Sequence, residues 1–464
     1  NAARMETNFI IILNDNNMSI SENVGGVSKY LNNIRTSNAY LDIKDNIYDA
    51  LRNTRYGDGV VTGVRRAKNS LKQLVIPGMW FEDMGITYLG PVDGHDVNGL
   101  VRVIREAKRR KNCVLIHVLT QKGKGYAPAE KHPARFHGAE PFDVATGVPV
   151  KKKTKANYTD IFSTVMVKLA ARHPDVVAIT AAMPDGTGLK RFRKAYPERF
   201  FDVGIAEEHA VTFAAGLAVG GLHPVVAIYS SFLQRAYDQI IHDVSLMHLN
   251  VLFGVDRAGL VPGDGETHQG IYDPAFFSQI GIPVFAPANY AELRYWLTYL
   301  VREAHGPRMI RYARGGENPA LAALPCTGAR YDVLDPVDGA RVALVSYGAE
   351  TEEIIAAKDL LAQHGVQADC VKLTQLYPLP DGVCDTLKHY DTILFAEDTV
   401  RTGGIGEQLC FAMQQCGWQG EFLLHAVDNR HLLHANVPEL RKDQQLDAAA
   451  LCADILNALK EKQA

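Results

Sequence analysis

Short apolar runs alternate with amphipathic stretches along most of the chain. In residues 100–107 the apolar positions recur at the spacing of one helix face, and the run Val114–Leu119 that follows is continuously apolar apart from one histidine. A period near 3.6 residues favours a helix, whereas a short apolar run favours a strand that is buried on both faces. This alternation predicts α/β layers built on mainly parallel sheets.

The same alternation continues in two further segments. We expect strands at residues 9–13, 176–180, 225–229, 251–255, 309–312, 342–346, 368–373 and 392–396, and helices at 210–219, 350–364 and 407–415. A lysine-rich run at 151–155 and a Pro- and Gly-containing stretch at 315–339 are interpreted as linkers. The sequence therefore predicts three consecutive parallel-sheet α/β domains at residues 1–150, 151–318 and 319–464, the first of them incomplete.

Composition narrows the class of protein. Of 464 residues, 47% are hydrophobic and 22% are charged, which excludes a disordered tail, a collagen or a coiled-coil rod. The formal net charge of −3 argues against a nucleic-acid binder but permits a local basic pocket for a phosphorylated small molecule. The longest apolar run, residues 210–229, is interrupted by Gly216, Gly220 and Pro224, so it predicts a core helix followed by a strand and no membrane span.

The cysteines indicate the cellular compartment of the protein, and the first residues indicate whether the chain is a fragment. Seven cysteines are scattered without a Cys-x-x-Cys pair, which indicates free thiols, no structural zinc and a cytoplasmic protein. The chain begins without Met and reaches the apolar strand at residues 9–13 almost at once. Because this strand has nothing before it to pair with, we interpret the chain as an N-terminally truncated fragment.

Polar clusters follow several of the expected strands. The Asn-rich string at residues 14–19 offers hard oxygen ligands that suit Mg²⁺ holding a diphosphate, although an ordinary turn is favoured on spacing alone. Glu207 follows an apolar Gly-Ile-Ala lead-in, where burial would raise the pKa of its carboxyl and let it hold or pass a proton. The alternative is that Glu207 and Glu208 only favour a helix N-terminus.

Two further strand ends carry arginines. Arg257 precedes a Gly-rich loop that contains Asp264 and His268, and Arg311 and Arg314 follow at the next strand. Arginine is well suited to bidentate phosphate recognition. Each residue alone has a simpler reading as a surface ion pair or a loop cap, but open α/β sheets bind ligands at the carboxyl ends of their strands. The Gly-rich string at residues 402–406 lacks a full dinucleotide fingerprint and is interpreted as a tight turn before a helix.

Taken together, these stretches resemble the 1-deoxy-D-xylulose-5-phosphate synthase family of the transketolase superfamily. The matching strings lie at residues 12–25, 90–96, 122–126, 136–137, 206–212, 231–239 and 256–270. The resemblance runs nearly from end to end and is looser after residue 315. It implies domains of transketolase type: residues 1–150 as the C-terminal part of a diphosphate-binding domain, 151–318 as a pyrimidine-binding domain and 319–464 as the C-terminal domain.

The resemblance also implies cofactors and site residues. Thiamine diphosphate and Mg²⁺ would be bound, with Asn16 and the backbone carbonyl of Met18 as metal ligands. Tyr126 and Phe232 match cofactor contacts, and Glu207 matches the glutamate that bonds the aminopyrimidine ring. The other matches are two pocket histidines and four acceptor-substrate contacts: His137, His268, Tyr229, Arg257, Asp264 and Arg314, with His268 also placed against substrate.

The implied reaction is decarboxylation of pyruvate and addition of the two-carbon unit to D-glyceraldehyde 3-phosphate, which would feed isoprenoid, thiamine and pyridoxal precursors. A homodimer is implied as well. No Gly-Asp-Gly string precedes Asn16 and the family's N-terminal cofactor histidines are absent, so we expect the fragment alone to be inactive. The alternatives are a transketolase, the first component of a 2-oxoacid dehydrogenase, or a non-catalytic half of a split enzyme.

Overall fold

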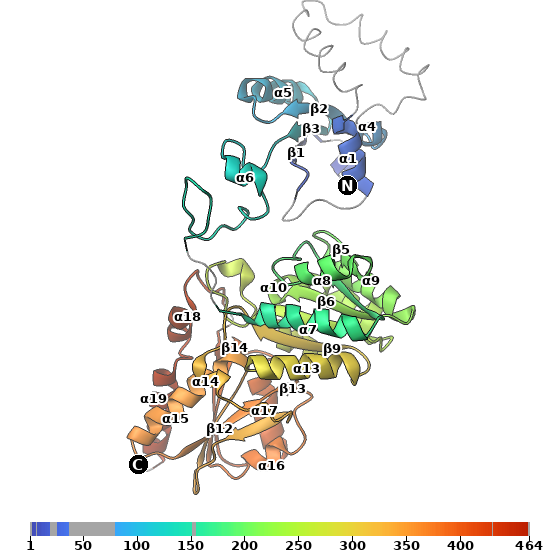
Figure 1. Ribbon diagram of the computed structural model, residues 1–464. Coiled ribbons are helices and arrows are strands. Elements are labelled where there is room, and N and C mark those ends of the chain that lie inside the picture. The colour runs from blue at the N-terminus through green and yellow to red at the C-terminus, as the bar shows by residue number, and fades with distance from the viewer. Residues whose placement is uncertain are drawn as a thin grey trace, which may run out of the picture. The chain divides into compact units, whose positions relative to one another are not determined.

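The computed structural model describes residues 2–5, 7–18, 26–36, 79–150, 155–428 and 430–462. The chain divides into two compact units, Asn1–Lys152 and Lys153–Ala464, which are treated separately below (Figure 1). Among these residues, no helix has the length and apolar character needed to cross a membrane. The apolar run at 210–229 is a helix followed by a strand, as its glycines and proline predict.

The first unit is built on a small parallel sheet. Its described strands run in the order β1-β3-β2, and the helix α5 connects β2 to β3. Buried residues on both faces of β3 form the core, among them Val114, Leu115 and Ile116. The described elements of this unit are η1 (Ala2–Met5), β1 (Ile10–Asp15), α1 (Gly26–Thr36), α4 (Met79–Asp83), β2 (Thr87–Asp93), α5 (Val97–Arg109), β3 (Val114–Leu119) and α6 (Ala127–Lys131).

The strand expected at residues 9–13 differs from the prediction in two respects. It begins at Ile10, and its partner is β3, a strand that lies about a hundred residues downstream. Phe9 and Ile12 are 52% and 56% exposed, so this strand is not buried on both faces. The reason is its position at the edge of the described sheet, where it has a single neighbour.

The second unit contains two sheets, and their strands alternate with helices along the chain. All the strands predicted in residues 176–396 are present, with boundaries shifted by a few residues. The described elements are α7 (Tyr158–Arg172), β4 (Val176–Thr180), α8 (Lys190–Ala195), η2 (Pro197–Arg199), β5 (Phe200–Asp202), α9 (Glu207–Val219), β6 (His223–Tyr229), α10 (Ser230–Leu233), η3 (Gln234–Ala236), α11 (Tyr237–Gln239), η4 (Ile240–Ser245), β7 (Leu252–Ala258), η5 (Glu266–His268), α12 (Asp273–Gln279), β8 (Val284–Phe285), α13 (Tyr290–Arg302), β9 (Arg308–Ala313), α14 (Pro319–Ala322), β10 (Tyr331–Leu334), β11 (Val342–Tyr347), η6 (Gly348–Glu350), α15 (Thr351–Gln363), β12 (Ala368–Leu373), β13 (Gln375–Tyr377), α16 (Val383–Leu387), β14 (Thr392–Val400), α17 (Ile405–Gln415), β15 (Glu421–Val427), α18 (Val437–Asp443) and α19 (Ala448–Glu461).

The larger sheet has the described order β13-β8-β9-β7-β6-β4-β5. The strands from β8 to β5 are parallel, so their carboxyl ends lie along one edge. The strand β13 comes from the C-terminal part of the chain and pairs antiparallel with β8. Residues beyond 319 therefore complete a sheet that residues 176–313 begin.

The smaller sheet has the described order β10-β12-β11-β14-β15 and is parallel except for β10. The stretch at 315–339 is not a plain linker, because it contains α14 and the edge strand β10. Pro319 is tolerated at the first helical position of α14, and β10 follows the turn-forming Gly328 at a positive φ of 74°.

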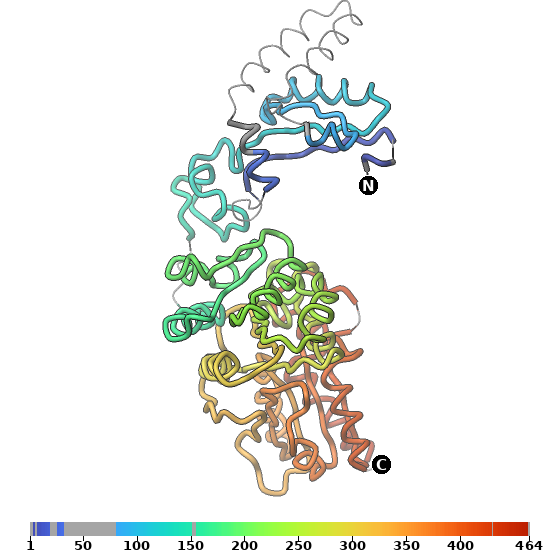
Figure 2. The backbone as a smooth tube through the Cα atoms, turned by 90° about the vertical axis from the view of Figure 1, so that its right-hand side faces the viewer, coloured from blue at the N-terminus to red at the C-terminus, as the bar shows by residue number. Residues whose placement is uncertain are grey.

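A single apolar cluster joins the two sheets of the second unit. It includes Val226 and Phe253 from the larger sheet and Val345 and Phe395 from the smaller one, all buried. Figure 2 shows the chain from about residue 320 onward, orange to red, packed along the green and yellow part of the same unit. This shared core fixes the carboxyl edge of the larger sheet relative to the C-terminal segment.

Candidate active site

The polar residues singled out in the second unit gather at the carboxyl edge of the larger sheet. Tyr229 ends β6, Arg257 lies one residue before the end of β7, and Arg314 directly follows β9. Glu207 opens α9, the helix that follows β5. Parallel strands bring residues that are far apart in sequence to one edge, which is where open α/β sheets bind ligands.

Glu207 is the first residue of α9, and its side chain is 2% exposed, whereas Glu208 is exposed. One carboxylate oxygen, Oε2, accepts a hydrogen bond from Nη1 of Arg235 at 3.0 Å. A buried carboxylate needs such a partner because desolvation without one is costly. The helix N-terminus adds a second favourable field for the negative charge.

Phe232 lies at the centre of an aromatic group. Its ring is stacked on Tyr229 with centroids 5.7 Å apart and meets the ring of His268 edge-on at 5.0 Å. The guanidinium carbon of Arg235 lies 5.8 Å from the centroid of the same ring. Arg235 therefore connects the carboxylate of Glu207 to this aromatic surface.

Arg257 is held in a strained backbone conformation with a φ of +58°. Its Nη1 donates to the carbonyl of Gly186 at 2.6 Å and to Asp256 at 2.8 Å, and its guanidinium lies 4.1 Å from the Tyr229 centroid. Burial alone would lower the pKa of Arg257, but the carboxylate of Asp256 raises it, so the guanidinium stays charged. Burial raises the pKa of the Tyr229 hydroxyl, and the charge of Arg257 partly opposes this effect.

The loop after β7 carries Asp264 and His268, and Arg314 contacts it from the end of β9. Arg314 forms an ion pair with Asp264 and donates to the carbonyl of Pro262 at 2.7 Å. His268 closes the loop with its Nδ1 2.9 Å from the hydroxyl of Thr267. Arg314 and Asp264 thus satisfy each other at the partly exposed rim, and Asp264 lies four residues before His268 of the partly buried aromatic group.

Unused buried donors mark this edge of the sheet as a place for a polar ligand. The Nε of Arg257 and the hydroxyl of Ser231 are buried and have no hydrogen-bond partner among the described residues. Buried polar atoms are usually satisfied, so such atoms call for an explanation. A bound molecule with acceptor atoms provides one, and the residues present fit the polar, phosphorylated ligands expected from the sequence.

The first unit holds the other predicted residues. After β1, the backbone N–H of Met18 donates to Oδ1 of Asn16 at 2.9 Å, and Asn17 adopts a positive φ of 61°. This is the Asn-rich turn considered from the sequence, and it leaves the Asn16 carboxamide and the Met18 carbonyl in one short loop. In the part of the chain that is described, no three His, Cys, Asp or Glu residues are grouped to hold a metal. A cation here would need ligand oxygens from elsewhere, as Mg²⁺ takes from phosphates.

Tyr126 and His137 follow β3 in the same unit. The hydroxyl of Tyr126 donates to the carbonyl of Val144 at 2.8 Å, and its ring packs against Phe136 and Phe142. Nδ1 of His137 lies 3.1 Å from Nζ of Lys122. Partial burial and the charge of Lys122 lower the pKa of His137, so the imidazole is neutral near pH 7.

The structure brings Tyr229, Phe232 and His268 into direct contact and joins Arg314 to Asp264. In the first unit, Asn16 and Met18 share one turn, and Tyr126 and His137 each have their own partners. Sequence reasoning did not assign roles to Arg235, Asp256 and Lys122, which contact Glu207, Arg257 and His137. For Asp256 and Lys122 the available signal was a charged residue within three positions of a strand end. Arg235 lies six residues after the end of β6, and no such signal marks it.

Comparison with known proteins gives a consistent picture. Residues 1–120 match the family described as 1-deoxy-D-xylulose-5-phosphate synthase, residues 154–317 match the transketolase pyrimidine-binding domain, and residues 332–451 match the transketolase C-terminal domain. The 1-deoxy-D-xylulose-5-phosphate synthase of Lachnoclostridium phytofermentans is 44% identical over 460 residues, which cover 97% of this chain and 73% of that protein. The enzyme of the same name from Clostridium acetobutylicum is 42% identical over 458 residues, with the same coverage of 97% and 73%.

Solved structures support the fold. A split-gene transketolase described as an inactive β4 tetramer matches with a TM-score of 0.57 at 25% identity, over 65% of this chain and 98% of that one. The transketolase of Campylobacter jejuni matches with a TM-score of 0.55 at 15% identity, over 98% of this chain and 74% of that one. The predicted α/β architecture of transketolase type is confirmed.

Proposed function

Because the chain belongs to the 1-deoxy-D-xylulose-5-phosphate synthase family, we propose that it condenses pyruvate with D-glyceraldehyde 3-phosphate and releases CO₂. Members of this family are transketolase-type transferases that depend on thiamine diphosphate and Mg²⁺. The bound cofactor supplies the electron sink for decarboxylation. The product would feed isoprenoid, thiamine and pyridoxal precursors.

The arrangement around Glu207 carries this proposal. Its carboxyl is buried at a helix N-terminus with one oxygen on Arg235, which leaves Oε1 to exchange a proton with a pyrimidine ring nitrogen. Phe232 offers an apolar face for that ring beside Tyr229 and His268. A buried proton-handling carboxylate next to an aromatic surface is what a pyrimidine cofactor requires.

The cationic residues at the same edge suit the phosphorylated acceptor. Arg257 stays charged and has an unused buried Nε, while Arg314 lies at the rim with Asp264. Guanidinium groups bind phosphate bidentately, so we assign Arg257 and Arg314 to the acceptor phosphate. Tyr229, Asp264 and His268 would contact the remainder of the acceptor.

The first unit would hold the diphosphate end of the cofactor. Asn16 and the Met18 carbonyl would supply two oxygen ligands to Mg²⁺, and Tyr126 would contact the cofactor. Partial burial and the charge of Lys122 lower the pKa of His137, so its neutral imidazole can accept a proton. We assign the domains 1–150, 151–318 and 319–464 to diphosphate binding, pyrimidine binding and the C-terminal role respectively.

Product analysis tests the proposed function. The protein, completed with an N-terminal segment that carries the family's Gly-Asp-Gly string, is incubated with thiamine diphosphate, Mg²⁺, pyruvate and D-glyceraldehyde 3-phosphate, and products are identified by mass spectrometry. All activity measurements below use this completed protein. Formation of 1-deoxy-D-xylulose 5-phosphate with CO₂ is expected. Two-carbon transfer between ketose and aldose phosphates without pyruvate would identify a transketolase instead, and no turnover with any pair would favour a non-catalytic half of a split enzyme.

Assembly and compartment belong to the same proposal. We infer a homodimer in the cytoplasm, supported by family membership and by seven cysteines whose thiols are free. Light scattering coupled to gel filtration measures the mass of the assembly.

Since no Gly-Asp-Gly string precedes Asn16, we expect residues 1–464 alone to bind thiamine diphosphate weakly. Calorimetry that found low-micromolar, Mg²⁺-dependent binding to residues 1–464 would overturn this expectation.

A further inference from the structure

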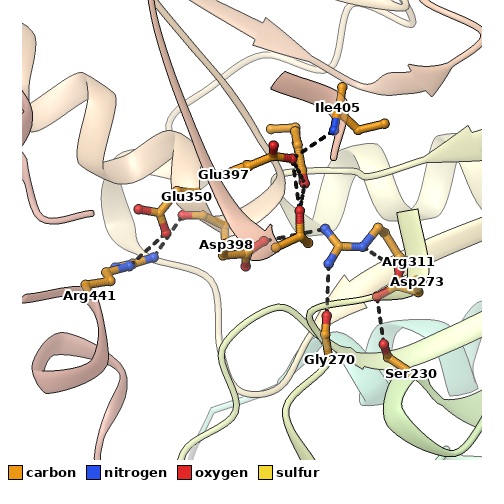
Figure 3. A network of polar contacts seen from close by, with 12 residues as sticks. Ser230, Gly270, Asp273, Arg311, Glu350, Glu397, Asp398, Ile405 and Arg441 are labelled. Atoms are coloured by element: carbon orange, nitrogen blue, oxygen red, sulfur yellow. Dashed lines mark hydrogen bonds and ion pairs between the residues drawn. The ribbon is translucent and has the colours of Figure 1, made fainter. Parts of the chain in front are cut away.

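Arg311 is a buried arginine that contacts several segments at once. It lies on β9, three residues before Arg314, and its side chain is 3% exposed. Its Nε donates to Asp273 at 2.8 Å, its Nη2 donates to the carbonyl of Gly270 at 3.4 Å, and its Nη1 lies 3.6 Å from Oδ1 of Asp398 (Figure 3). None of these partners is among the residues assigned to cofactor or substrate.

Asp273, the first partner of Arg311, connects it to the aromatic group formed by Tyr229, Phe232 and His268. Asp273 is fully buried, and its second oxygen accepts a hydrogen bond from the hydroxyl of Ser230 at 2.6 Å. Ser230 is the first residue of α10, so it directly follows Tyr229 and precedes Phe232 by two positions. Asp273 therefore fixes the start of the short helix that carries Phe232.

The second partner leads to the loop with Asp264 and His268. Gly270 pairs with Gly259 through two backbone hydrogen bonds of 2.7 and 2.9 Å, which close this loop at its base. A Cβ built on Gly270 would lie 2.0 Å from the carbonyl oxygen of Arg257, so the backbones are in close contact here. The hydrogen bond from Arg311 reaches the loop at this closure.

The third partner comes from the C-terminal segment. Asp398 lies on β14 of the smaller sheet and is 6% exposed. A Cβ built on Gly259 would lie 1.8 Å from Oδ2 of Asp398. Asp398 therefore lies in close contact with the base of the loop on one side and with Arg311 on the other. The backbone N–H of Val400 also donates to the carbonyl of Ile271 at 3.0 Å.

We propose that Arg311, with Asp273 and Asp398, is a positioning unit for the reaction: it sets the spacing between the helix that carries Phe232 and the loop that carries Asp264 and His268. Through Asp398 the C-terminal segment takes part in defining the site. The planar guanidinium directs two hydrogen bonds, to Asp273 and Gly270, and one ion pair, to Asp398, in fixed directions. The ammonium group of a lysine is a rotatable point charge and does not reproduce this geometry. This inference rests on the proposed function for its kinetic consequence, although the geometry can be tested without it.

The test compares Arg311→Lys with Arg441→Lys. Arg441 is also buried, with 7% side-chain exposure, and is paired with carboxylates, but its partners are Glu350, Glu352 and Glu353. We expect both variants to have lower melting temperatures. Arg311→Lys should also lose 10-fold or more in kcat/KM, while Arg441→Lys should stay within twofold of the unmodified protein.

Hydrogen–deuterium exchange gives a readout that does not require turnover. Arg311→Lys should speed exchange of amides in residues 230–233 and 259–270, and Arg441→Lys should not. Should Arg311→Lys fail to fold, Asp398→Asn, which keeps the side-chain shape, is held to the same criteria. Unchanged exchange in both segments, or activity within twofold despite a lower melting temperature, would refute the inference. An unmodified protein that makes no product would refute the proposed function instead, and the exchange data would still decide the positioning role.

Discussion

Two buried arginines in the second unit are held by carboxylates in similar ways but connect different parts of the chain (Figure 3). Arg311 joins β9 to Asp273 and to Asp398, and so links both sheets to the candidate site. Arg441, on α18, donates to Glu350 at 2.9 Å and to Glu353 at 2.7 Å, two residues near the start of α15. Its network therefore stays within residues 319–464.

The comparison of Arg311 with Arg441 shows that the burial and ion pairing of an arginine do not by themselves indicate a role in the candidate site. Removing one partner of a buried pair costs roughly 3–5 kcal/mol wherever the pair lies. Both arginines are expected to matter for stability by this amount. The two arginines differ in what their carboxylate partners bind in turn. Asp273 accepts a hydrogen bond from the hydroxyl of Ser230, next to the aromatic group, whereas Glu353 accepts one from the backbone N–H of Ala448.

The largest effect should come from a residue that lies in the site itself. Glu207→Gln should lower turnover by at least about 100-fold, because an amide cannot take up and release the proton that general acid–base catalysis requires. Glu208→Gln is the matched control and should be mild, since Glu208 is exposed and only favours the start of α9 by about 0.3–1 kcal/mol. NMR of the exchange of the cofactor's thiazolium proton isolates this step from substrate binding. A slower exchange in Glu208→Gln and an unchanged one in Glu207→Gln would move the assignment by one residue.

A smaller effect on substrate binding is expected for Arg314, which lies three residues after Arg311 at the end of β9. Arg314→Lys should raise the KM for D-glyceraldehyde 3-phosphate by about 10-fold, because lysine cannot form the bidentate contact with phosphate. The KM for pyruvate, which carries no phosphate, should change little. Equal losses for both substrates would mean that Arg314 supports the loop through Asp264 and Pro262, and would place it with Arg311 as a positioning residue.

A glycine substitution tests the place of Asp398 without touching a charge. Gly259→Ala would put a methyl group 1.8 Å from Oδ2 of Asp398 and should push this carboxylate away from Arg311. We expect a loss of several-fold in kcat/KM. Gly281→Ala is the control, since Gly281 has a similar φ of +75° against +76° for Gly259 but open space around its Cβ. Strain from the positive φ affects both variants, so equal activities would remove Asp398 from the positioning unit.

The fold was largely predictable from the apolar pattern, because the buried parallel strands are short apolar runs bounded by turn residues. Val114–Leu119, Val176–Thr180 and Ala368–Leu373 match the expected strands residue by residue. The strand β10 was missed, since its sequence Tyr-Asp-Val-Leu is only partly buried and lies at a sheet edge. Pairing of β13 with β8 was not predictable either, because the three residues of β13 carry too little pattern to specify a partner about 90 residues earlier in the chain.

The candidate site was predictable where chemistry follows directly from a strand end. Glu207, Arg257 and Arg314 could be singled out because a charged residue directly after an apolar run is unusual. The partners Arg235 and Asp273 could not, because their contacts cross 28 and 38 residues of sequence, from Arg235 to Glu207 and from Asp273 to Arg311. A hydrogen bond between distant segments depends on the packed fold, and a single sequence does not contain it.

The pH response of the Arg441 network concerns stability, and we expect it to have the smallest effect on activity. Here one guanidinium faces Glu350, Glu352 and Glu353, and burial, with added repulsion from Asp398 and Glu353, raises the pKa of Glu350 from 4.5 to about 8 despite Arg441. The unfolded chain releases this proton near pH 4.5, so the folded state holds one more proton between about pH 4.5 and 8. Stability from this group is therefore fully present at low pH and declines as the pH rises through that window, at no more than about 1.4 kcal/mol per pH unit. Glu350→Gln keeps an acceptor for Arg441 but removes the titration. The difference in melting temperature between Glu350→Gln and the unmodified protein, followed from pH 5 to 8 at constant ionic strength, should shift steadily in favour of the variant. A difference that stays constant with pH would show that Glu350 is ionised throughout and that Arg441 compensates its burial completely.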